Sequence, residues 1–170
     1  MWSRRPSIPA GVRSALGLPN TERVLAAALL TDGGWAVATR TELITTDGSA
    51  DVVVRHVWSD VDRASFDPAH AAITVRWVDQ QAPLRLRLAD ATRSRLARVV
   101  RERVEWSVVL AEEVPLPGDR TARVAVRRDV DGTLFSQVLA GAGVDLDAPD
   151  VGPVVDAAEQ RVRAAAGMAW

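Results

Sequence analysis

The sequence predicts an α+β fold, and three observations carry that prediction. Apolar and polar residues alternate with a period of two at residues 73–77 and 84–88, which is the pattern of strands with one face in a core and one in water. Residues that suit tight turns separate shorter apolar runs, at residues 31–34 and 47–48. The period then changes, and apolar residues recur at helical spacing between residues 96 and 104. Short antiparallel strands followed by an amphipathic helix are typical of the α+β class.

Residues 22–89 are predicted to form an antiparallel meander, because turn-forming residues bound each short apolar run. Trp58, Ser59 and Asp60 are predicted to form a corner at which the meander changes direction. The expected strands are 23–30, 35–38, 43–46, 52–57, 62–66, 73–77 and 84–88.

The first long helix is expected after Asp90, because aspartate is a good N-cap. Its apolar stripe consists of Leu96, Val99, Val100 and Val104. A stripe of this width predicts a helix that packs one face on the meander.

Beyond this helix the sequence again favours strands. Residues 106–114 form a β-prone run, which the segment 115–118, with its two prolines and a glycine, is expected to end. Residues 121–128 alternate as a strand, and Asp131-Gly132 is a hairpin signal that leads into residues 134–139.

Both ends of the chain are predicted to carry helices. A frayed arm at residues 1–8 precedes a short helix within residues 9–18. After a loop at residues 141–150, Asp147 or Asp150 is expected to cap a last helix. Its predicted apolar face is Val154, Val155, Ala158, Val162 and Ala165.

Three stretches resemble the bacterial pleckstrin-homology-like domains. They are the segment 22–26 entering the first strand, the segment 86–90 entering the helix, and the corner 58–61 with the following residues 64–67. The resemblance implies a β-barrel of two antiparallel sheets, capped by a helix, at residues 22–104. A C-terminal β-hairpin and helix would follow.

The resemblance extends to a whole family. The segments 100–104 and 114–116 fit the continuation of a family of actinobacterial proteins that carry a bacterial pleckstrin-homology-like domain. The implied organisation is an N-terminal arm with a short helix at 1–21, the barrel at 22–104, and a β-rich extension with a terminal helix at 105–170. No activity is known for that family, so the resemblance implies a fold and not a function.

Composition excludes several classes of function. The chain has 170 residues and a net charge of −1, which gives it no overall attraction for nucleic acid. It has no cysteine, which excludes disulfides and cysteine-bound zinc. It has no lysine either, which excludes Schiff-base chemistry and a P-loop lysine. Arginine in place of lysine indicates a GC-rich genome.

The sequence predicts a cytoplasmic protein without an integral membrane segment. No apolar run approaches the roughly 20 residues of a membrane helix. Arg4-Arg5 resembles a twin-arginine export signal, but Gly11, Arg13 and Ser14 interrupt the apolar segment that should follow.

No catalytic, cofactor or metal site is expected. The two histidines are His56 and His70, and neither has a partner constellation that the sequence reveals. The acidic run that ends at Asp150 lacks the glycine and terminal glutamate of a calcium loop. No glycine-rich nucleotide loop occurs.

The candidate interaction surface consists of Arg95, Arg98, Arg101 and Trp170. The three arginines share one face of the predicted helix, where they would meet phosphates or an acidic partner, or else be solvated and paired along the helix. Trp170 is a candidate anchor for another chain, because tryptophan is enriched at interface hot spots.

The expected function is that of a non-catalytic protein-interaction or scaffold module. Its partner would be a protein not identified by the sequence, a second copy included, and an exposed edge strand would capture it. The alternative is a domain that binds a small ligand or an anionic lipid head group, with peripheral lipid contact the weaker case. Asp32 in the first hairpin loop, which has no arginine, disfavours phosphoinositide binding.

Overall fold

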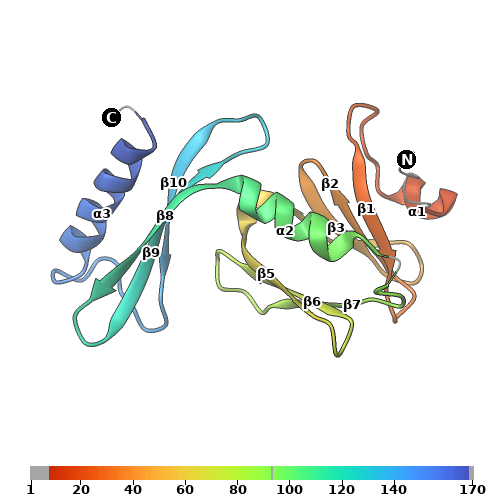
Figure 1. Ribbon diagram of the computed structural model, residues 1–170, viewed down its shortest axis with the longest axis horizontal. Coiled ribbons are helices and arrows are strands. Elements are labelled where there is room, and N and C mark those ends of the chain that lie inside the picture. Colours follow the sequence, from red (N-terminus) through yellow and green to blue (C-terminus); the bar gives the residue numbers. More distant parts are fainter. Residues whose placement is uncertain (1–7, 93, 169–170) are drawn as a thin grey trace. The chain divides into compact units, whose positions relative to one another are not determined.

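The computed structural model describes residues 8–92 and 94–168, and it has a mixed α+β fold with three antiparallel sheets (Figure 1). It divides into two compact units, unit 1 (Met1–Glu105) and unit 2 (Trp106–Trp170). Each unit has a hydrophobic core of its own.

Unit 1 contains two sheets. The first has the order β1-β2-β3-β4, and the second has the order β5-β6-β7. A short 3-10 turn, η1 (Trp58–Asp60), leads from the first sheet into the second. The strands are β1 (Val24–Leu29), β2 (Trp35–Thr39), β3 (Glu42–Thr46), β4 (Val52–Val57), β5 (Val61–Asp67), β6 (Ala72–Trp77) and β7 (Leu84–Arg87).

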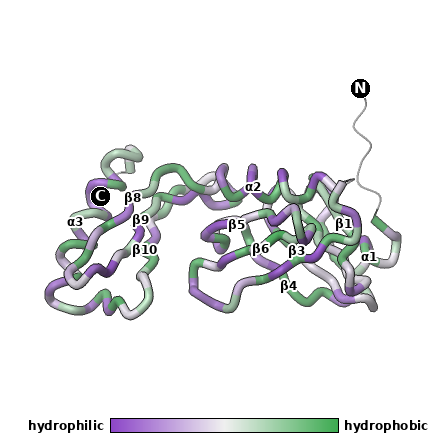
Figure 2. Tube along the Cα trace, turned by 60° about the horizontal axis from the view of Figure 1, so that its bottom comes forward, coloured by the Kyte–Doolittle hydropathy of each residue, from purple (hydrophilic) through white to green (hydrophobic). Residues whose placement is uncertain are grey.

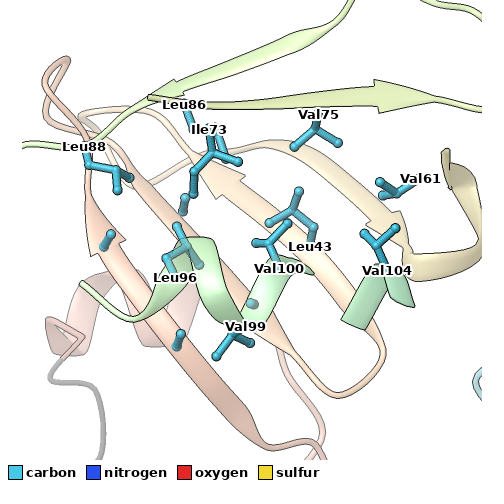
Figure 3. Close-up of a cluster of buried hydrophobic side chains, with 14 of the residues drawn as sticks. Leu43, Val61, Ile73, Val75, Leu86, Leu88, Leu96, Val99, Val100 and Val104 are labelled. Atoms are coloured by element: carbon cyan, nitrogen blue, oxygen red, sulfur yellow. The ribbon is translucent and has the colours of Figure 1, made fainter. Parts of the chain in front are cut away.

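The main core of unit 1 lies between these sheets and helix α2 (Leu96–Ser107). In Figure 3 the apolar stripe of α2, with Leu96, Val100 and Val104, faces side chains of both sheets, such as Ile73. The remaining face of α2 is polar, so hydrophilic (purple) and hydrophobic (green) segments alternate along the helix in Figure 2. The helix forms here because its apolar stripe is buried on the sheets.

The two sheets do not close into the expected barrel. At one end Leu30 and Leu88 form an isolated bridge, and the amide of Thr31 donates to the carbonyl of Arg87 over 3.0 Å. At the other end no ladder joins β4 to β5. There η1 lies between β4 and β5 in the chain and places the Trp58 indole in the core, where its Nε1 donates to the carbonyl of Thr39 over 3.1 Å. The prediction that the two sheets close into a barrel is therefore wrong.

Helix α1 (Ala10–Ala15) covers part of the outer face of the first sheet. Val12 within this helix and Leu16 at its C-cap pack with Val37 and Ile44 in a small separate cluster. The Arg55 guanidinium donates to the carbonyl of Leu16, which fastens the end of this segment to β4.

Unit 2 is one sheet covered on one face by a helix. The sheet has the order β10-β9-β8, with β8 (Val108–Leu116), β9 (Arg120–Arg128) and β10 (Leu134–Ala140), and the helix is α3 (Gly152–Ala165). The core residues of β8 and β9 are fully buried, whereas Leu134 and Val138 of β10 are partly buried. The buried residues are Val114, Leu116, Ala122, Val124, Val126, Val151, Val155, Ala158 and Val162.

The helix caps differ from those expected. The Asp90 carboxylate accepts from the amide and hydroxyl of Thr92 in a local turn, and the Ser94 hydroxyl takes the first free amide of α2, that of Leu96, over 3.1 Å. For α3 the cap is Val151, without a side-chain hydrogen bond. Asp150 instead accepts from Arg120 over 3.1 Å, because the chain returns to that strand 30 residues later.

Two boundaries also differ. Trp106 was expected in a strand but lies in the last turn of α2. Pro115 was expected to end a strand but lies within β8, opposite Thr121. Because β8 is an edge strand, the missing N–H of proline costs it no ladder hydrogen bond.

Candidate interaction surfaces

The arginine face of α2 is present but carries its own counterions. Arg98 lies 3.6 Å from Glu102, and Arg101 lies 3.7 Å from Glu105, each pair one helical turn apart. Arg95, which was expected on the same helix face, lies one residue before α2 begins; it is exposed and has an interaction of its own. The four paired side chains are all more than half exposed, so each pair contributes little to stability but offsets the positive charge. Trp170 lies outside the described residues.

His56 belongs to a cluster at the corner between the two sheets of unit 1. Its Nδ1 lies 3.0 Å from Asp60 Oδ2, and its ring centroid lies 4.4 Å from that of Trp77. The cluster ties β4 to η1 and β6. The neighbouring Ser59 is buried, so this histidine has a structural setting without an accessible nucleophile in the same turn.

His70 holds a turn together with Asp67. The Asp67 carboxylate accepts from the amides of Ala69 and His70 and lies 2.6 Å from His70 Nδ1. The hydrogen bond from the His70 side chain is the main reason that the pKa of Asp67 lies below its ordinary value of 3.8. Both histidines thus bind a carboxylate three or four residues away. Across residues 8–92 and 94–168, no group of three metal-ligating side chains comes together.

The sheet edges offer a different kind of surface. An edge strand exposes unpaired backbone groups, and proteins protect such edges with charges, proline or β-bulges. The three sheets have six edge strands: β1, β4, β5, β7, β8 and β10.

Five of the six edges carry such protection. β1, β4, β5 and β8 each contain a register shift. Charged residues lie in β4, β5, β7 and β8, and β8 also contains Pro115.

The sixth edge strand, β10, has none of these features. Its seven residues, Leu-Phe-Ser-Gln-Val-Leu-Ala, contain no charge, no proline and no glycine, and they pair with β9 in one unbroken register. We call the free side of this strand the β10 edge.

The direction of the backbone groups at the β10 edge follows from two neighbouring hydrogen bonds. The amide of Gly141 donates to Thr121, and the carbonyl of Thr133 accepts from Asp129, so odd-numbered residues direct their groups toward β9. In an antiparallel pair the direction alternates. The N–H and C=O groups of Leu134, Ser136 and Val138 therefore point away from the sheet.

The side chains at the β10 edge fall on two faces. Ser136 and Val138 share the face covered by α3, where the Ser136 hydroxyl donates to Glu159 and accepts from Arg163. Phe135, Gln137 and Leu139 occupy the opposite face, and all are half-buried.

Sequence reasoning named residues 134–139 as a strand but did not single it out as a surface. The sequence does show that residues 134–139 contain no charged residue and no proline, but the expected strands 35–38 and 43–46 share that property. What the sequence does not show is which strands lie at an edge.

The chain matches no protein-family model, and no curated protein matches it significantly. Within the described part of the chain, no helix is long and apolar enough to cross a lipid bilayer.

Proposed function

We propose that this chain is a non-catalytic protein-interaction or scaffold module that binds an extended strand of a protein partner at the β10 edge. The observation that carries the proposal is the regular, uncharged edge of β10, at which the backbone groups of Leu134, Ser136 and Val138 point away from the sheet. Strand addition uses main-chain hydrogen bonds for affinity and alternate side chains for specificity. Phe135 and Leu139 on one face of β10 favour a partner strand with apolar residues at alternate positions.

The alternative, binding of an anionic lipid head group by the α2 arginines, has less support. Arg98 and Arg101 already face Glu102 and Glu105 at ion-pair distance. A phosphate would have to compete with these carboxylates, and the first hairpin loop adds Asp32, whose carboxylate is engaged with the amide of Gly34.

The proposal also covers fold family and location. A pleckstrin-homology-like fold for residues 22–104 is supported by the order of four strands, three strands and a helix. The bridge between Leu30 and Leu88, which joins the two sheets at one end, supports it as well. Membership of the actinobacterial family and a cytoplasmic location are parts of the same proposal.

The test is capture of partners from a lysate of the source organism with the tagged wild type and with Val138→Pro. The Val138 amide points away from β9, so proline removes a donor from the β10 edge and leaves the ladder to β9 intact. Proteins and extracted lipids are identified by mass spectrometry. We expect a protein that binds the wild type and is lost from the variant.

Val57→Pro is the matched control. The Val57 amide also points outward from an edge strand, β4, because the next amide, that of Trp58, donates inward to Thr41. Val57 has φ −70°, which proline adopts without strain. This variant should capture the same protein as the wild type. Capture unchanged by Val138→Pro, or enrichment of lipid alone, would contradict the proposal.

A further inference from the structure

We infer that the β10 edge pairs with the β10 edge of a second copy of this chain, about a two-fold axis that passes between the two Gln137 residues. This inference rests on the proposed function, because it names the partner strand for the same edge. It follows from the backbone pattern, the side-chain pairs and the charges around the axis.

The backbone pattern restricts the possible registers. Two antiparallel strands form hydrogen bonds only where the groups of both residues point toward one another. At the β10 edge these are the even-numbered residues, so an even-numbered residue must face an even-numbered one. A two-fold axis at Gln137 satisfies this, since Ser136 then faces Val138 of the second copy and the reverse pair forms on the other side. In this register residues 135–139 of the two copies lie opposite one another.

The side chains also complement themselves in this register. Phe135 of each copy faces Leu139 of the other, which gives two aromatic–aliphatic pairs on one face of the joined sheet. Between them the two Gln137 residues form a pair without backbone hydrogen bonds, in which side chains approach most closely.

Gln137 suits the position on the axis. Its Oε1 accepts from Arg127 Nε over 3.2 Å, which orients the side-chain amide. That bond leaves both N–H groups of the amide and one lone pair of the oxygen for other partners. Two amides related by a two-fold axis can therefore donate to one another. An amide is its own complement, whereas a charged residue on the axis would face a like charge.

Charges near the axis are complementary as well. Each copy brings Glu159 and Arg163, both in contact with Ser136. The two Ser136 residues are diagonal neighbours across the new ladder, with Cα atoms roughly 7–8 Å apart. Glu159 of one copy thus approaches Arg163 of the other, and the reverse, with opposite signs in both cases.

The experiment begins with sedimentation of the purified chain up to roughly 1 mM, a concentration that reveals even a weak association. We expect a concentration-dependent dimer, because an interface of one strand pair is small. A second measurement uses single cysteine variants, which are clean probes because the chain has no cysteine.

Gln137→Cys should form an intermolecular disulfide rapidly under mild oxidation, since Cα atoms in a pair of this type lie within disulfide range. Phe135→Cys is the matched control on the same strand and face. The Cα atoms at position 135 of the two copies would lie roughly 13 Å apart, because the positions are four residues apart along the strand and each residue spans about 3.3 Å. The two cysteines should therefore not cross-link.

A third variant guards against loss of folding in Gln137→Cys. Gln137→Glu keeps an acceptor for Arg127 but places two carboxylates opposite one another on the axis. It should leave the far-UV circular dichroism unchanged and weaken dimerisation about tenfold or more.

A chain that stays monomeric at all concentrations, equal cross-linking of the two cysteine variants, or a dimer unaffected by Gln137→Glu would each overturn the inference. The proposed function would fail separately, if Val138→Pro changed no capture from the lysate. A monomeric chain that still captured another protein through the β10 edge would retain the function and exclude the second copy as partner.

Discussion

The two units of this chain solve the problem of a stable core differently. Unit 1 buries large side chains, Trp58, Leu43 and Ile73 among them, between two sheets and a helix. Within residues 106–168, the buried core of unit 2 has no aromatic residue and consists of valine and alanine with Leu116 alone as a larger side chain. A smaller core buries less apolar surface, so unit 2 has less hydrophobic stabilisation available.

Polar contacts are correspondingly prominent in unit 2. Arg127 is buried and donates to Ser107 and Gln137, and Arg128 lies with its guanidinium 5.0 Å from the Trp106 ring centroid. Hydrogen bonds and cation–π contacts are directional, so they help to fix the structure of a unit in which apolar packing contributes little stability. The comparison teaches that the unit with the weaker core is also the one with the open edge, so a partner at that edge would add stability where it is scarce.

Trp58→Ala should have the largest effect. Trp58 is only 1% exposed, so the substitution leaves a cavity in the core, and it also removes the hydrogen bond to Thr39. The free energy of unfolding of unit 1 should therefore fall by about 3–5 kcal/mol. Denaturation followed by circular dichroism measures this. Trp58→Phe, which keeps most of the volume, should lose less than half as much, and equal losses would show that the indole does not fill the core as described.

Val124→Ala should come next, with a loss of about 2 kcal/mol confined to unit 2. Val124 is fully buried against α3. Four of the six tryptophans lie in unit 1 and two, Trp106 and Trp170, lie in unit 2, so fluorescence weights unit 1 more heavily and its transition should shift less than the one seen by circular dichroism. If the fluorescence transition shifted as far as that seen by circular dichroism, the two units would unfold as one, and the contrast between their cores would not matter for stability.

Ser107→Ala should cost about 1.5 kcal/mol, the lower end of the net value of one hydrogen bond to a charged group such as the buried Arg127. The loss should appear in the circular dichroism transition of unit 2. Thr121→Ala, at an exposed position of β9, is the control and should cost less. A neutral Ser107→Ala would mean that the polar contacts of unit 2 do not compensate for its small core.

Asp67→Asn should have the smallest effect, and the effect should depend on pH. The folded-state pKa of Asp67 lies below 3.8, so the charged form stabilises unit 1 above that pH and the contribution is lost as the pH falls below it. Wild type and variant should therefore differ slightly in melting temperature at neutral pH and converge in strong acid. A difference that grew in acid would contradict the hydrogen bond from His70 as the cause.

Much of the fold could be predicted from periodicity. The alternation at Ile73, Val75 and Trp77 gives β6, and the stripe that begins at Leu96 gives α2, because both patterns reflect burial of one face. Caps and boundaries could not, since they depend on distant partners. Asp150 pairs with Arg120 rather than with its own helix, and Pro115 is tolerated only because β8 is an edge.

The candidate site was less predictable than the fold. The acidic partners of Arg98 and Arg101 stand four residues later in the sequence, so their pairing was open to prediction. The β10 edge was not, because strand order is a property of the folded sheet. Trp170 remains a prediction outside the described residues.

Pro115 has one further consequence. The sheet of unit 2 has two outer strands, and the second, β8, combines this proline with a register shift and the acidic pair Glu112 and Glu113. A two-fold contact at β10 would therefore occupy the edge of this sheet that can accept another strand. Assembly would then stop at two copies instead of growing into a filament. Finite assembly would be built into the sequence, at a residue that takes no part in the contact.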